Sequence, residues 1–155
     1  MQEPITFWGI TVERSGARTI ALSGVVLLCI VFYLAFSDSQ YTAPDLMSML
    51  VILVSKVIGL VSLLPVYGLP LIVSMLLAIC MKNAFPQFVL SATSLLYGGW
   101  FAYQMYNVFY VLPTDAQNGL IVVFVGIYFL PIALPLWGLA AIVEICKRKK
   151  DAAKV

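Results

Sequence analysis

The chain of 155 residues is 63% hydrophobic and only 10% charged, with a mean hydropathy of +1.03 and a formal net charge of +2. Soluble domains contain roughly 45–50% apolar and about 25% charged residues. A soluble chain of this size could not hide so much apolar surface, because much of its area must face water. The composition therefore excludes a soluble globular domain, a disordered chain and a nucleic-acid-binding module. It predicts an all-α, polytopic membrane protein that forms a single membrane domain in a lipid bilayer.

The first apolar run, residues 19–36, is long enough to cross a membrane. A helix needs about 20 apolar residues to cross a hydrocarbon core of about 30 Å. The run follows Arg14 and Arg18, as the apolar part of a signal peptide would. It is long for such a peptide and further apolar runs follow it, so we predict an uncleaved transmembrane helix.

The second apolar region, from Leu46 to Met81, is too long for one straight crossing. At 1.5 Å per residue it would measure about 54 Å, nearly twice the apolar core. Two prolines and a glycine within residues 65–70 favour a break there. We predict an interfacial or partly inserted amphipathic helix over about 43–64, followed by a crossing over about 65–81. A long tilted helix that kinks at the prolines is the alternative, and it gives the same topology.

Two further crossings are predicted over about 85–106 and 120–145. The outer end of the first is rich in tyrosine and tryptophan, which prefer the headgroup level of a membrane. The second contains Pro131 and Pro135, which predict kinks.

The distribution of charge favours four crossings over five. With four, eight of the nine basic residues lie on one side of the membrane, and Asp38, Asp45 and Asp115 lie on the other. Five crossings would move the basic cluster Lys147–Lys150 to the opposite side, against the positive-inside rule. We therefore predict cytoplasmic N- and C-termini. Short loops and the lack of an Asn-x-Ser/Thr sequon fit a bacterial inner membrane, with an organellar membrane as the alternative.

One stripe on the predicted amphipathic helix is a candidate surface for binding a partner. Ser48, Ser55, Gly59 and Ser62 share this stripe, with Lys56 beside it. A small-x-x-x-small pair such as Ser55 and Gly59 lets two helices approach closely. The polar side of an interfacial helix is the alternative interpretation. Lys56 would cost about 3 kcal/mol at the bilayer centre, so we expect it to reach the outer headgroups.

A second polar face lies on the third predicted crossing. It contains Thr93, Tyr97, Trp100, Gln104 and Asn107. Such a face can line a path for a polar substrate or ion. Hydrogen bonds to neighbouring helices are the favoured interpretation, because an unsatisfied polar group in lipid is costly.

The sequence favours a protein without catalytic residues, metal or cofactor. It contains no histidine, which removes the commonest general base and metal ligand. Cys29, Cys80 and Cys146 lack a C-x-x-C spacing. Within the predicted spans no pair of carboxylates could hold a metal. Glu144 lies at a membrane face, three and four residues before Lys147 and Arg148, with which it can pair.

In size and topology alone, the chain resembles immunity proteins against pore-forming bacteriocins, entry-exclusion proteins and small accessory subunits of respiratory or secretion complexes. No motif supports transferring a residue's role from them. The prediction is a non-catalytic protein that contacts another membrane protein or a larger membrane complex, as an accessory subunit or an immunity-type inhibitor. A small oligomeric channel or transporter is the alternative.

Overall fold

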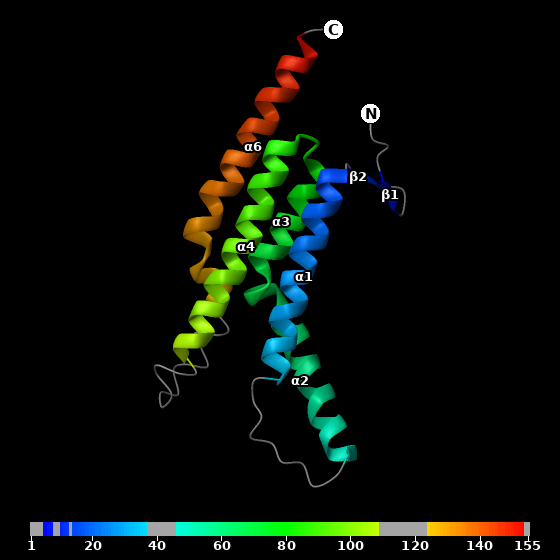
Figure 1. Cartoon of the computed structure of the whole chain (residues 1–155), viewed down its shortest axis with the longest axis vertical. Helices are drawn as coiled ribbons and strands as arrows, with labels where there is room; N and C mark the ends of the chain where they lie inside the picture. Colours follow the sequence, from blue (N-terminus) through cyan, green and yellow to red (C-terminus); the bar gives the residue numbers. More distant parts are fainter. Residues whose placement is uncertain (1–4, 8–9, 13, 37–45, 109–123, 154–155) are drawn as a thin grey trace.

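The computed structural model is a helical bundle preceded by a short hairpin (Figure 1). It describes residues 5–7, 10–12, 14–36, 46–108 and 124–153. The helices are α1 (Arg14–Phe36), α2 (Leu46–Tyr67), α3 (Leu69–Cys80), α4 (Ala84–Tyr106) and α6 (Leu130–Ala152).

The hairpin consists of β1 (Ile5–Phe7) and β2 (Ile10–Val12), which pair antiparallel. These two three-residue strands are a detail that the all-α prediction lacks. The rest of the described chain is predominantly helical.

Helix α4 lies at the centre of the bundle and contacts α1, α3 and α6. Helices α1 and α4 run in one direction, and α2, α3 and α6 run in the other (Figure 1). The start of α1, the turn between α3 and α4, and the last turns of α6 therefore lie toward the same end of the molecule.

Three stretches are long and apolar enough to cross a membrane: Ser15–Ala35, Leu46–Tyr67 and Leu130–Ala152. Helix α4 has the same length as α6, 23 residues, but no 18-residue stretch of it is as apolar as those of the three candidates, so it does not belong to this group. Helix α3, with 12 residues, is about 18 Å long, which is shorter than the apolar core. The structure thus supports the membrane class, with three candidate spans by composition.

The break expected within residues 65–70 lies at Gly68, between α2 and α3. Pro65 is accommodated in the last turn of α2, so this helix extends three residues beyond the predicted end at residue 64. Pro70 lies in the first turn of α3, where a missing N–H group costs no helical hydrogen bond. Gly126 packs against the break, because an added Cβ there would lie 2.3 Å from the main-chain oxygen of Val66.

The last predicted crossing, 120–145, has different bounds in the structure. Helix α6 starts at Leu130 and continues to Ala152, and residues 124–128 form a separate helical segment. Residues 120–123 lie outside the described part of the chain. Pro131 occupies the first turn of α6, so it starts the helix rather than kinking it, whereas Pro135 lies inside.

A polar seam joins α1 to α4. The hydroxyls of Thr19 and Ser91 are 3.0 Å apart, and those of Ser23 and Ser94 are 2.8 Å apart. One turn further along α4, a Cβ added to Gly98 would lie 3.0 Å from a valine methyl of α1. Small and hydroxylated residues thus bring the two parallel helices close together, as is typical of interfaces between membrane helices.

Candidate functional site

Helix α2 is the least covered element of the described chain. No residue of its most apolar 18-residue stretch is buried, although the helix is 22 residues long and strongly apolar. Its one buried residue is Tyr67, at the end that joins α3. Large exposed apolar side chains occupy the rest of the helix, namely Leu46, Met47, Met49, Leu50, Val51, Val54, Val57, Ile58, Val61 and Leu63. The remainder of the described bundle therefore leaves this helix open to lipid or to another protein.

The predicted partner-binding residues lie on this open helix. Ser55, Gly59 and Ser62 are exposed, and Ser48 and Lys56 are partly exposed. The Ser62 hydroxyl donates to the carbonyl of Ile58 in the preceding turn, at 3.0 Å. A Cβ added to Gly59 would meet nothing within 4 Å. This small-residue face is therefore not occupied by another described helix of the same chain.

The second predicted face, on α4, points mainly into the bundle. Thr93 and Tyr97 are fully buried. The Thr93 hydroxyl donates to the Val89 carbonyl at 2.8 Å, and the Tyr97 hydroxyl donates to the Tyr67 carbonyl beside the helix break. The Tyr97 bond joins α4 to the end of α2, whereas the Thr93 bond stays within α4.

The other three residues of that face, Trp100, Gln104 and Asn107, are partly exposed. Trp100 lines an open apolar groove of about 620 Å³ between α4 and α6. Its indole N–H is buried without a hydrogen-bond partner. A second apolar groove of about 600 Å³ lies between α1 and α4.

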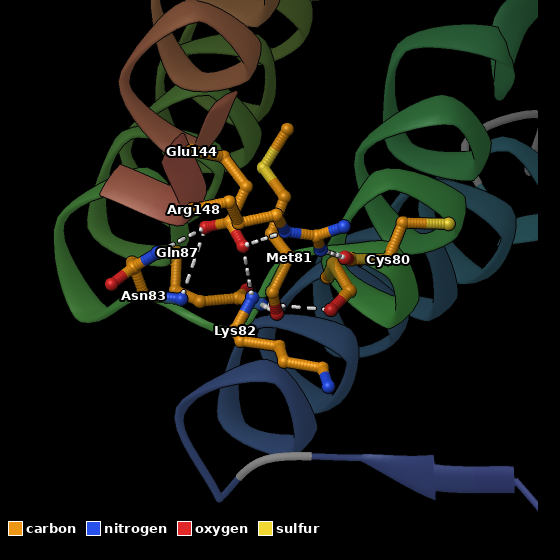
Figure 2. A network of polar contacts seen from close by, with 8 residues as sticks. Cys80, Met81, Lys82, Asn83, Gln87, Glu144 and Arg148 are labelled. Atoms are coloured by element: carbon orange, nitrogen blue, oxygen red, sulfur yellow. Dashed lines mark hydrogen bonds and ion pairs between the residues drawn. The ribbon is translucent and has the colours of Figure 1, made fainter. Parts of the chain in front are cut away.

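Glu144 on α6 forms the most polar buried site that the structure describes (Figure 2). This residue is 4% exposed. Its carboxylate accepts hydrogen bonds from the main-chain N–H groups of Lys82 and Asn83, both at 3.1 Å, and from the Asn83 side chain at 2.8 Å. Arg148 donates to the same carboxylate at 2.9 Å and also reaches the carbonyl of Cys80. Of the two expected partners of Glu144, Lys147 and Arg148, it is Arg148 that forms the ion pair.

These bonds fix the turn between α3 and α4 onto α6. A helix N-terminus leaves N–H groups without helical partners and favours a negative charge. Asn83, the residue that precedes α4, makes no capping bond with its own side chain to the first turn. The Glu144 carboxylate lies beside this N-terminus and satisfies the N–H groups of the turn. Its four hydrogen bonds make it a structural acceptor rather than an available general base.

Gln87 holds the same turn from the inside. Its side-chain amide donates to the carbonyls of Ala78 and Met81, both at 2.7 Å, and its main-chain carbonyl accepts from Thr19 at 3.2 Å. Its side-chain oxygen is buried without a partner. The turn is therefore bonded to α1, α3 and α6.

Sequence reasoning missed these bonds, apart from the pairing of Glu144 with Arg148. Asn83 immediately before an apolar run indicates a helix start, and Thr19 and Ser23 are four residues apart on one helical face. These signals mark polar positions on separate helices. They do not say which helices meet, so they could not show that Glu144 reaches Lys82 and Asn83.

The described residues contain no group of three His, Cys, Asp or Glu side chains that could hold a metal ion. Cys29, Cys80 and Cys146 are free and exposed.

Comparisons with models of protein families, with curated proteins and with solved structures find no match to this chain.

Proposed function

We propose that this chain is a non-catalytic, multi-pass membrane protein that acts through helix contacts with another membrane protein. In this role it is an accessory subunit or an immunity-type inhibitor. The observation that carries the proposal is the uncovered α2, a span-length apolar helix whose most apolar 18-residue stretch contains no buried residue. An apolar surface of this extent must be covered by lipid or by protein. Ser55, Gly59 and Ser62 form an exposed face of small residues on this helix. Small residues let another helix approach closely, so a helix of a partner protein is favoured over lipid.

The proposed topology has four crossings: α1, the α2–α3 pair, α4 and α6. Helices α2 and α3 run in the same direction and share one crossing, so the start of α1 and the end of α6 lie on the same side (Figure 1). The positive-inside rule makes that side the cytoplasm, because Lys82 and Lys147–Lys150 lie there. The proposed location is a bacterial inner membrane.

The length of the α2–α3 pair places Lys56 near the opposite surface. About 20 helical residues cross the apolar core, so a crossing that starts at Met81 reaches the far boundary near residue 61. Lys56 lies about one turn further. The first half of α2 then extends along or beyond that surface as a partly inserted helix, and the Lys56 ammonium reaches the headgroups.

A cysteine at position 56 is therefore expected to react with a membrane-impermeant thiol reagent added to intact cells. The background for this Lys56→Cys variant lacks the three native cysteines. The matched control is Leu71→Cys, which is fully buried in α3 and is expected to stay unlabelled. Lys147→Cys is expected to react only after the cells are permeabilised. Protection of position 56 with labelling at position 147 in intact cells would contradict the proposed orientation.

The partner contact is tested by photo-crosslinking from α2. A photoreactive residue at Gly59 is expected to give a discrete crosslink to one membrane protein. The same residue at Leu134, an equally lipid-accessible position on α6, is expected not to. The substitution Gly59→Trp is expected to reduce co-purification of the crosslinked protein in mild detergent by about tenfold or more, since a bulky side chain prevents close helix approach.

The same experiment separates the proposal from a small oligomeric channel or transporter. A crosslink only to a second copy of this chain, together with ion or solute flux in liposomes, would replace the accessory role by that alternative. Crosslinking to lipid alone at Gly59 would contradict both.

A further inference from the structure

Charge in the described chain is concentrated at one end of the bundle. Lys56 is the one charged residue of the described helices away from this end. The exposed basic side chains at this end come from three separate places in the sequence: Arg18, Lys82, Lys147, Arg148, Lys149 and Lys150.

Hydrogen bonds hold these three places together. Thr19, the residue after Arg18, donates to the Gln87 carbonyl in the first turn of α4. The main-chain N–H of Lys82 donates to Glu144, one turn before the basic segment of α6. The basic residues of α1, of the α3–α4 turn and of α6 are therefore brought to one end by the fold itself.

Little negative charge opposes them within the described residues. The acidic residues that the structure describes at this end are Glu144 and the exposed Asp151. The Glu144 carboxylate forms an ion pair with Arg148 and accepts a hydrogen bond from the main-chain N–H of Asn83 in the turn. The Lys82 ammonium points away from the Glu144 carboxylate (Figure 2). The last turns of α6 extend past the turn between α3 and α4 (Figure 1), and Lys147, Lys149 and Lys150 are exposed.

The basic segment directly continues an apolar helix. Residues 130–146 of α6 contain one charged residue, Glu144, and the next four residues are all basic. A helix of this composition places its cations within about one turn of the membrane surface. Basic segments adjoining a transmembrane helix attract anionic headgroups, and each cation contributes separately.

We propose that this end of the bundle is a binding surface for anionic phospholipid headgroups. Lys147, Lys149 and Lys150 are its principal cations, with Lys82 and Arg18 at its margin. A lipid is favoured over a soluble polyanion because α6 holds these lysines at the depth where lipid phosphates lie. The surface is independent of the partner contact proposed for α2.

The proposal is tested with the full chain in liposomes that contain spin-labelled lipid. The fraction of motionally restricted label is compared for phosphatidylglycerol and phosphatidylcholine with identical acyl chains. The unmodified chain is expected to prefer phosphatidylglycerol by about fivefold. The triple substitution Lys147→Gln, Lys149→Gln, Lys150→Gln is expected to bring this ratio close to one.

Two controls keep the result specific. Lys56→Gln removes a cation from α2 and is expected to leave the preference unchanged, whereas Lys149→Gln alone is expected to lower it. High salt is expected to reduce the preference of the unmodified chain, because exposed charges are screened, and this control requires no substitution.

Equal binding of the two lipids, or a preference that survives both the triple substitution and high salt, would overturn the proposal. Displacement of phosphatidylglycerol by an equal concentration of an RNA oligonucleotide would overturn the assignment to lipid.

Discussion

Replacement of Glu144 by alanine is expected to lower the free energy of unfolding by about 3 kcal/mol, because several donors in a buried site lose their acceptor at once. The N–H groups of Lys82 and Asn83, the Asn83 amide and the Arg148 guanidinium all donate to this carboxylate. Unfolding of the purified protein in mixed detergent micelles, followed by circular dichroism, measures the change.

Two further substitutions show whether the loss arises from the turn. Glu144→Gln keeps an acceptor oxygen but directs an NH₂ group at the remaining donors, so an intermediate loss is expected. Asp151→Asn, at an exposed position two turns later in α6, is expected to change stability by less than about 0.5 kcal/mol. Equal effects of Glu144→Ala and Asp151→Asn would mean that the Glu144 carboxylate does not hold the α3–α4 turn.

The substitution Gly126→Ala is expected to destabilise the bundle by about 3 kcal/mol, the upper part of the range for overpacking. The added methyl would lie 2.3 Å from the Val66 oxygen and 2.9 Å from the Tyr67 oxygen. Both atoms belong to the main chain beside the helix break, so a change of side-chain rotamer cannot relieve the contact.

Gly138→Ala is the matched control and is expected to have the opposite sign. This glycine lies within α6, and a Cβ there would meet nothing within 4 Å. Alanine is favoured over glycine in a helix by up to about 1 kcal/mol, so the variant is expected to be as stable as the parent or more stable. Similar stability of the two variants in the same unfolding experiment would contradict the close approach of Gly126 to the break.

Several features of the fold follow from local sequence and were predictable. The apolar excess indicates a membrane protein, and Pro65, Gly68 and Pro70 locate the break between α2 and α3, because proline and glycine act on the backbone nearest to them. The pairing of Glu144 with Arg148 also depends on a spacing of four residues within one helix.

The remaining features depend on which helices meet, and periodicity within one helix does not contain that information. The small-residue face of α2 could equally have packed against α1 or α3, and only the structure shows Gly59 open. The break between residues 124–128 and α6 was not predicted, because an apolar run continues across Phe129 and Leu130 without a polar boundary. The partner-binding role of α2 remains a prediction.

The polar character of α4 has a consequence for biosynthesis. No 18-residue stretch of α4 is as apolar as the three candidate spans, and the bonds described above for Ser94, Gln87 and Tyr97 reach α1, α3 and the end of α2. All of these elements precede α4 in the chain. When α4 leaves the ribosome, the partners of these three side chains have therefore already been synthesised. The order of the helices thus provides each of these groups with a partner before the helix that carries it enters the lipid.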